Sequence, residues 1–254
     1  MSPLRPGYVD GGYSVHRFAV PPSLADRRFT HIRLNSHPDG GIARMRVWGI
    51  VARDFDRELA YEAVGAIDLL STLNGARALG CSNKHYGEPR NLLRPEPGAN
   101  MGEGWETARN PHRPHVLETD AATGFVKMPG VREWCVLRLA AVASQLEELV
   151  VDTHHFRGNF PESVLIEACN APAAPSSALL DGYDASPLEW KQLLPRTRLG
   201  PDQEHRFSGA ELTQLGAISH VRVSIFPDGG LMRVRAIGRA AAPMPNEGLE
   251  AVGQ

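Results

Sequence analysis

The sequence predicts an all-β protein, a sandwich of short strands joined by many turns. Glycine and proline together account for 45 of the 254 residues, somewhat above average usage. They interrupt short runs of β-branched residues more than long helical patterns, which favours a sandwich. An apolar fraction of 42% supplies a sizeable core and is too high for a disordered chain.

One early segment departs from the β pattern. Residues 58–79 carry apolar side chains at helical spacing, with Asn74 and Gly75 as a stop signal, and predict a helix. Three short apolar runs then predict strands, at residues 134–139, 148–152 and 163–168. Residues 170–187, rich in Ala, Pro and Ser, predict a surface loop, and the chain after Pro243 predicts a disordered tail.

An internal repeat relates the two ends of the chain. Residues 31–49 align without a gap with residues 220–238, at a constant offset of 189, and nine of the 19 aligned positions are identical. The chain therefore holds parts of two copies of one domain. Because the second copy extends upstream to near residue 57, the body of the first copy has no room in this chain. We expect a C-terminal remnant of one repeat, a complete second repeat and a disordered tail, in residues 1–55, 56–242 and 243–254.

The repeated segment predicts a β-hairpin near the end of each copy. Residues 227–230, Pro-Asp-Gly-Gly, are a turn signal between two alternating runs. Val221, Val223 and Ile225 alternate with polar residues before the turn, so one face is expected on the core and the other is expected to carry His and Arg.

Three pairs of arginines recur in both copies: Arg33 and Arg222, Arg44 and Arg233, Arg46 and Arg235. They are candidates for binding an anionic ligand. The alternative is that they form the solvated face of a hairpin or bridge the sheets through ion pairs.

The densest polar cluster spans residues 152–163. In an extended strand Asp152 and His154 would share one side and His155 would face the other. A histidine can act as a general acid or base near neutral pH, and Asp152 could orient one. The alternative is a strand end whose Asp and Asn satisfy backbone donors in a turn.

A second polar cluster spans residues 100–109. It contains Glu103 between two glycines, then Trp105, Glu106 and Arg109. Such a loop could bring a carboxylate and an arginine to the mouth of a site. The alternative is a surface loop anchored by Trp105. No histidine pair has a tight ligand spacing, so a divalent metal is left open and its ligands are unknown.

Composition and missing motifs exclude several classes of function. A formal net charge of −2 argues against a dedicated nucleic-acid binder. No apolar stretch reaches the length of about 18 residues needed to span a membrane, and the N-terminus lacks the apolar segment of a signal peptide. Cys81, Cys135 and Cys169 are far apart and are interpreted as reduced thiols of a cytoplasmic protein. Phosphate-binding glycine loops, Gly-x-Ser-x-Gly and Cys-x-x-Cys are absent from the sequence.

The two polar clusters and the closing turn resemble the allantoicase family. The family's Gly-Trp-Glu-Thr segment matches residues 104–107, and Asp-Thr-x-x-Phe-x-Gly-Asn-x-Pro matches residues 152–161. Its closing Arg-x-x-x-x-Pro-Asp-Gly-Gly matches residues 222–230. The resemblance covers residues 14–240. Asn83 and Glu103 depart from it, since the family is expected to carry Asp at both positions.

The resemblance implies a galactose-binding-like (discoidin-like) jelly-roll β-sandwich that hydrolyses allantoate to ureidoglycolate and urea in purine degradation. It implies acid–base work by His154 or His155, with Asp152 as the orienting carboxylate. The remaining candidates are substrate-binding or catalytic groups: Glu106 and Asn159 for the ureido groups, Arg109 or Arg222 for the carboxylate, and Trp105 beside them.

The resemblance implies a small-molecule substrate, allantoate. A homo-oligomer is expected because the leftover strands of the truncated repeat lack partners. Composition and charge predict neither nucleic acid nor a membrane as a partner. Two other interpretations stay open. The chain could be a non-catalytic ligand-binding sandwich, or an inactive truncated remnant whose N-terminal strands have lost their partners.

Overall fold

A computed structural model describes residues 15–25, 27–55, 65–127, 130–180 and 188–245. The chain divides into two compact units, residues 1–47 and 48–254. The strands all belong to the second unit, within the described ranges. The candidate catalytic residues lie in this unit as well.

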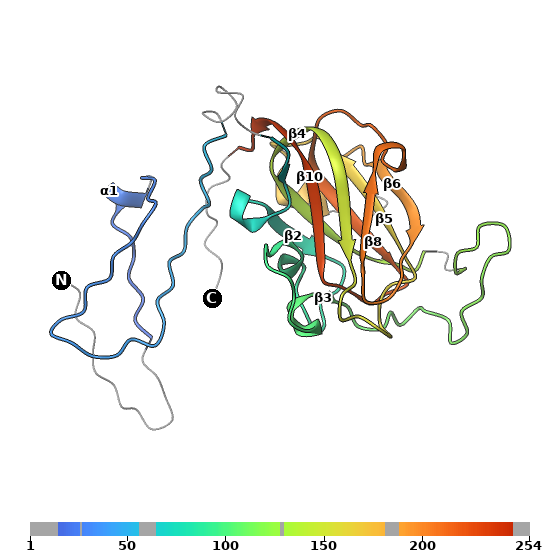
Figure 1. Ribbon diagram of the computed structural model, residues 1–254, viewed down its shortest axis with the longest axis horizontal. Coiled ribbons are helices and arrows are strands. Elements are labelled where there is room, and N and C mark those ends of the chain that lie inside the picture. The colour runs from blue at the N-terminus through green and yellow to red at the C-terminus, as the bar shows by residue number, and fades with distance from the viewer. Residues whose placement is uncertain (1–14, 26, 56–64, 128–129, 181–187, 246–254) are drawn as a thin grey trace. The chain divides into compact units, whose positions relative to one another are not determined.

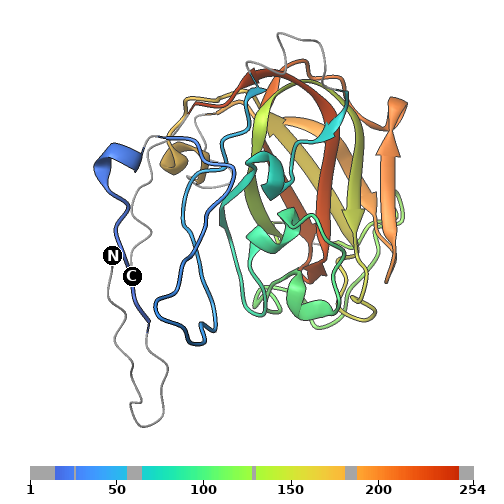
Figure 2. The same cartoon turned by 60° about the vertical axis from the view of Figure 1, so that its left-hand side comes forward.

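Strands in residues 48–254 form a β-sandwich (Figures 1 and 2). Their bounds are β1 Ile67–Asp68, β2 Arg77–Cys81, β3 Trp105–Glu106, β4 Glu133–Asp152, β5 Ser163–Cys169, β6 Lys191–Arg198, β7 Glu204–Ser208, β8 Ile218–Phe226, β9 Gly230–Leu231 and β10 Arg233–Pro243. Every pairing between these strands is antiparallel. The all-β prediction is confirmed.

The long strand β4 takes part in both layers of the sandwich. Its first residues, Glu133 to Arg138, pair with β2 on one edge and β8 on the other, and β8 continues to β5 and β6. Its last residues, Glu148 to Asp152, pair with β10 and β7. The register shifts between Arg138 and Ala143, where the strand leaves one layer for the other. Strands that change layers in this way make the corners of sandwiches.

The predicted hairpin of the second copy is wrong in its pairing. Strands β8 and β10 do form on either side of the turn at residues 227–229, but they are not hydrogen-bonded neighbours. Both edges of β8 are taken by β4 and β5, so β10 pairs with β4 and β1 instead. The turn is therefore an arch between the layers.

A single large core fills the space between the layers. It takes side chains from both, including Leu137, Leu149, Val223, Ile225 and Val234, all fully buried. The alternation predicted for β8 holds on this face, since Val221, Val223 and Ile225 point inward.

The opposite face of β8 is buried as well, which corrects the expected polar, solvated face. His220 and Arg222 are 0% and 5% exposed. A smaller apolar cluster covers this side, with Val136, Leu179 and Trp190 among its members. Its cover includes the short helix α3, Ser176–Leu180, in the segment predicted as a surface loop.

The helix predicted for residues 58–79 is wrong over its described part. That part holds β1, a 3₁₀ turn (η1, Thr72–Asn74) and β2, while residues 56–64 lie outside the described residues. Asp68 accepts hydrogen bonds from the backbone N–H groups of Leu70 and Ala236, which ends β1 after two residues. Three further 3₁₀ turns are η2 Pro89–Leu93, η3 Met101–Glu103 and η4 Gly209–Glu211. Most of the predicted tail, residues 246–254, also lies outside the described residues.

In its described residues, 15–25 and 27–47, the N-terminal unit contains one short helix, α1 (Pro22–Ala25). The copy of the repeated segment at residues 31–49 has no strand. The turn glycine keeps its backbone conformation, with φ of +121° at Gly40 and +130° at Gly229. The hairpin predicted for this copy is therefore also wrong. No helix in the described ranges is long and apolar enough to cross a membrane.

Candidate active site

Asp152 closes strand β4 and holds the following histidine. One oxygen, Oδ1, accepts hydrogen bonds from the His154 backbone N–H at 2.8 Å and from the His154 Nδ1 at 2.7 Å. The carboxylate is 8% exposed and the imidazole 49% exposed. Thr153, fully buried between them, donates its hydroxyl to Gly200 O. The result is a His–Asp pair with the far edge of the imidazole open to solvent.

His155 faces a different neighbour. Its backbone adopts a left-handed conformation, with φ of +69°, and its N–H donates to Asp202 Oδ1 at 2.8 Å. Its Nε2 lies 2.8 Å from Gly98 O, and the two histidine rings are 6.5 Å apart. The expectation that the histidines diverge agrees with this geometry, although a turn rather than a strand produces it.

The second predicted cluster is built around β3, which pairs with β9. Trp105 lies opposite Leu231 and Glu106 opposite Gly230. The Trp105 ring is fully buried and donates its Nε1–H to Asn83 O at 2.9 Å. Trp105 therefore anchors the segment from within the core.

The two polar clusters meet through a side-chain hydrogen bond. Asn159 Nδ2 donates to Glu106 Oε1, and both side chains are half-buried. The Asn159 carbonyl also accepts from Gly230 N at 2.9 Å, so β9 lies against both segments. Residues far apart in the sequence thus share one end of the sandwich.

The two departures from the family pattern have identifiable contacts. Asn83 Oδ1 accepts from the Ala108 N–H at 3.0 Å, a contact that an aspartate oxygen could also make. Glu103 Oε2 accepts from the Ala99 N–H at 2.9 Å, and this bond lowers the pKa of the Glu103 carboxyl.

Two predicted site residues, Arg222 and Arg109, make no contact with this cluster within the described part of the chain. Arg222 lies in the buried face of β8, where Nε and Nη2 each donate to Glu167 at 3.0 Å beneath the Trp190 ring. Its charge already has a carboxylate partner. Arg109 is exposed, and within the described part of the chain its side chain makes no hydrogen bond or ion pair.

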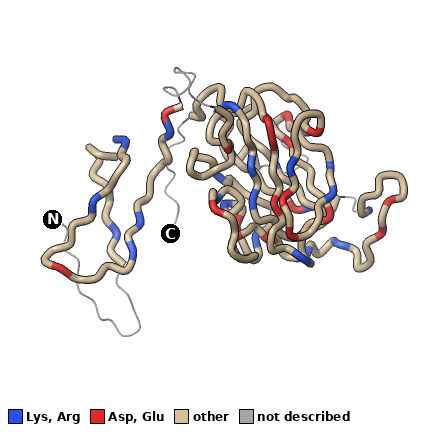
Figure 3. The backbone as a smooth tube through the Cα atoms, in the orientation of Figure 1, with Lys and Arg blue, Asp and Glu red and all other residues tan. Residues whose placement is uncertain are grey.

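A groove of about 700 Å³ runs beside His154 and His155 over the layer formed by β10, β4 and β7. Among the residues that line this groove, Arg233 and Arg235 were predicted only as repeat positions, and Glu148, Glu204 and Arg206 were not predicted. Acidic and basic residues are interspersed over the sandwich (Figure 3). No motif signalled the missed residues, because strand pairing alone places them in one groove.

Arg233 is the most buried charge of the groove, at 2% exposed. Its guanidinium donates to the carbonyls of Glu96, Glu103 and Met232, and Nη2 has no partner among the described residues. Burial lowers the pKa of Arg233, helped by the positive charges of Arg235 and Arg94. The arginine ties the loop of residues 96–103 to β10.

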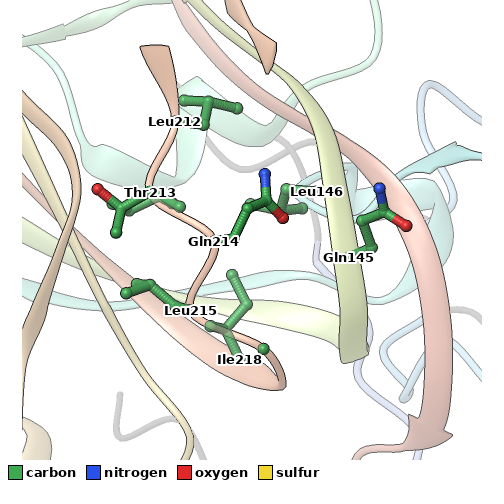
Figure 4. Close-up of a pocket in the computed structure, with 9 residues that line it drawn as sticks. Gln145, Leu146, Leu212, Thr213, Gln214, Leu215 and Ile218 are labelled. Atoms are coloured by element: carbon green, nitrogen blue, oxygen red, sulfur yellow. The ribbon is translucent and has the colours of Figure 1, made fainter. Parts of the chain in front are cut away.

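A second pocket is too small to bind a substrate. It has a volume of about 10 Å³ and lies among Leu146, Leu212 and Ile218 (Figure 4). That is room for about one water molecule. Among the described residues, no group of three or more His, Cys, Asp or Glu side chains could hold a metal ion.

A family model described as the allantoicase repeat matches residues 6–52 and 67–241. The chain belongs to the allantoicase family. It is 41% identical to a probable allantoicase from Pseudomonas paraeruginosa over 218 residues, which cover 86% of this chain and 58% of that protein. A probable allantoicase from Pseudomonas syringae pv. syringae is 38% identical, with 85% and 57% covered. The chain thus spans less than two thirds of these relatives.

Solved allantoicase structures have the same fold. The crystal structure of allantoicase from Saccharomyces cerevisiae matches 80% of this chain and 49% of its own, with a TM-score of 0.56 and 34% identity. A second allantoicase structure matches 68% of this chain and 43% of its own, with a TM-score of 0.51. The galactose-binding-like jelly-roll class expected of an allantoicase is confirmed.

Proposed function

We propose that this protein hydrolyses allantoate to ureidoglycolate and urea, a step of allantoin degradation. The observation that carries the proposal is the meeting of the Asp152–Asn159 and Glu103–Arg109 segments at one end of a sandwich of the allantoicase family. The names of the relatives support it.

His154 is the proposed acid–base residue. In the reaction the bond between the central carbon and one ureido nitrogen breaks, a water oxygen bonds to that carbon, and a proton moves from the water to the departing urea. Protonated His154 can give the proton at Nε2 and then take one back from the water. Asp152, 2.7 Å from Nδ1, holds the imidazole in one orientation.

Glu106 and Asn159 are proposed to bind the ureido groups. A carboxylate oxygen accepts from urea N–H groups, and an amide can accept and donate. Their mutual hydrogen bond keeps both side chains half-buried and oriented. Trp105 supports them from the core, and His155 is proposed to position the loop through Gly98.

Arg109 is the proposed partner of the substrate carboxylate. Its guanidinium is exposed and follows Glu106 by three residues, whereas Arg222 is already paired with Glu167. A planar guanidinium can bind a carboxylate with two hydrogen bonds.

We further propose that residues 1–55 are the C-terminal part of one repeat and residues 56–242 a second one. The separate match of residues 6–52 to the repeat model supports this division. Because relatives are longer, activity can require the body of the first repeat. We also propose a homo-oligomer in the cytoplasm, to be checked by light scattering and cell fractionation.

The test is urea release from allantoate by the purified chain, with and without added divalent metal. We expect His154→Ala, Asp152→Asn and Glu106→Gln each to lower turnover by about 100-fold or more. His112→Ala, in an exposed loop, is the control and keeps full turnover.

Normal turnover in all three variants would reject the assigned roles. An inactive but folded chain would leave two interpretations, a site completed by the first repeat or a binding role. The same assay on a chain with that repeat restored distinguishes them, because only the first interpretation predicts urea.

A further inference from the structure

Two of the three cysteines, distant in the sequence, are cross-strand neighbours. Cys81 closes β2 and Cys135 lies near the start of β4, and the two are partners in the antiparallel register. Both are free thiols. The two cysteines are 54 residues apart in the sequence, and the pairing of β2 with β4 brings them together.

The hydrogen bonds around the pair define how close its side chains come. The Ser82 N–H donates to Trp134 O at 2.9 Å, one residue beyond the pair on each strand. That bond makes Cys81 and Cys135 a non-hydrogen-bonded pair of the antiparallel ladder, in which the two backbones do not bond each other directly. Cα atoms at such positions are about 4.5 Å apart. Disulfides form at Cα separations of about 4.4–6.8 Å.

Both thiols lie on the same side of the sheet. Cys135 is fully buried in the main core, and half-buried Cys81 packs against that core. Gly80, the preceding residue, faces Leu180 on the opposite side. Cys169 belongs to the separate cluster on that opposite side, with Val136 and Leu179, so it is not positioned to compete.

We propose that Cys81 and Cys135 are a dithiol pair that peroxide oxidises to an intrachain disulfide. The Cys81 sulfur attacks the peroxide O–O bond, becomes a sulfenic acid and releases one water. The Cys135 sulfur then displaces the sulfenic oxygen as a second water. Two thiols lose two protons and two electrons in total, and these convert one hydrogen peroxide to two waters.

The order of the two steps follows from access and ionisation. Cys81 is partly exposed, whereas Cys135 is fully covered and can react only with a neighbouring sulfur. Burial raises the pKa of both thiols, that of Cys135 well above its ordinary value. Oxidation is therefore slow at neutral pH and accelerates as the pH is raised, since the thiolate is the nucleophile.

The disulfide would fix an edge strand beside the candidate active site. Strand β2 pairs only with β4 in the described part of the sheet. The residues after Cys81 support the site: Ser82 donates to Glu133, and Asn83 accepts from Trp105 and Ala108. We expect the oxidised form to unfold at a temperature several degrees higher. The inference does not depend on the allantoate reaction.

The experiment treats the full chain with hydrogen peroxide, denatures it, alkylates the remaining thiols and maps the peptides by mass spectrometry. The expected product is an intact chain two hydrogens lighter, with Cys81 and Cys135 joined and Cys169 alkylated. Dithiothreitol should restore the mass and the original unfolding temperature. Cys81 found as a sulfinic acid beside an alkylated Cys135, or any disulfide to Cys169, overturns the proposal.

Matched variants separate the pair from general oxidation. Cys169→Ser should form the same disulfide as the unchanged chain. Cys81→Ser should lose it while keeping the fold, because residue 81 is partly exposed. A disulfide-sized mass loss that persists in Cys81→Ser would also overturn the proposal.

Discussion

His220 is a fully buried histidine outside the candidate active site. It lies on β8, in register with Arg138 of β4 and Cys169 of β5. Its Nδ1 is 2.9 Å from Ser219 Oγ, and Nε2 has no partner among the described residues. Burial lowers the pKa of His220 to about 4, and the charge of Arg138 adds to the effect. The folded protein therefore keeps this imidazole neutral where the unfolded chain would protonate it.

This histidine should make stability fall as the pH drops from about 7 to 4. In the unfolded chain His220 is protonated near pH 6.5, whereas in the folded chain it is protonated only near pH 4. The loss is about 2 kcal/mol at pH 5, or an unfolding midpoint lower by about 5 °C. Thermal unfolding at pH 7.5 and 5 measures it. In His220→Leu the unfolding temperature should differ less between the two pH values, whereas the exposed His112→Leu variant should keep the full difference. An equal difference in both variants would refute the effect.

The arginines show what the sequence could and could not predict at this scale. Their recurrence in both copies singled out Arg222, Arg233 and Arg235. Their partners could not be predicted, because Glu167 and Asp68 reach them only through strand pairing. Arg222 and Arg235 do form ion pairs, but with carboxylates on the neighbouring strands β5 and β1 of their own layers, and not across the two layers. Arg233 contacts neutral carbonyls.

The short strand β9 connects the site to the core through one close contact. A Cβ on Gly230 would lie 2.0 Å from the ring of Phe156, and Phe156 is fully buried between His154 and Asn159 in the chain. Because the ring sits in a packed interior, it has no free space to move into.

Gly230→Ala should therefore destabilise the protein by about 1–3 kcal/mol and lower activity further, since the ring would push on the site segment. Denaturant unfolding and urea release measure the two effects. Gly158→Ala is the control, because a Cβ there meets nothing within 4 Å. Unchanged stability and activity of Gly230→Ala would show that the Phe156 ring can shift to make room for the added methyl group.

At the scale of elements, the positions and inward faces of strands could be predicted from the sequence, but their pairing could not. Alternation placed Val221, Val223 and Ile225 correctly on the core face. The three predicted strand segments all lie in strands, but the first two are parts of one long strand, β4. Alternation says which side faces inward, but not which strand lies alongside. The Pro227–Gly229 turn therefore looked like a hairpin although it joins two layers. The site segments were predicted separately. They meet through the Asn159–Glu106 hydrogen bond and through β9, which pairs with β3 and donates from the Gly230 N–H to Asn159 O.

The two copies of the repeated segment differ most in what covers them. Ile32, Leu34, Ile42 and Val47 are between 43% and 57% exposed. Their counterparts in the second copy, Val221, Val223, Leu231 and Ala236, are each 0% exposed. A nearly identical pattern thus forms strands only where neighbouring strands cover it, because isolated strands gain little from propensity alone.

Removing residues 1–47 should therefore cost the folded unit little. We expect the shortened chain to unfold at the same temperature within about 2 °C, because the core side chains lie beyond residue 47. It should also bind less of the dye ANS, which reports exposed apolar surface. Calorimetry and dye fluorescence check both. A large fall in the unfolding temperature would mean that the N-terminal unit supports the rest.

Strand β4, 20 residues long, belongs to both layers of the sandwich. In a sandwich whose layers share no strand, one layer can separate from the other without breaking backbone hydrogen bonds. Here opening either layer breaks hydrogen bonds of the same strand, so we expect the two layers to unfold together. The molecule should lose its amide protection against deuterium in one cooperative step, and the Asp152–His154 pair, fixed at the end of that strand, would persist until the whole sandwich opens.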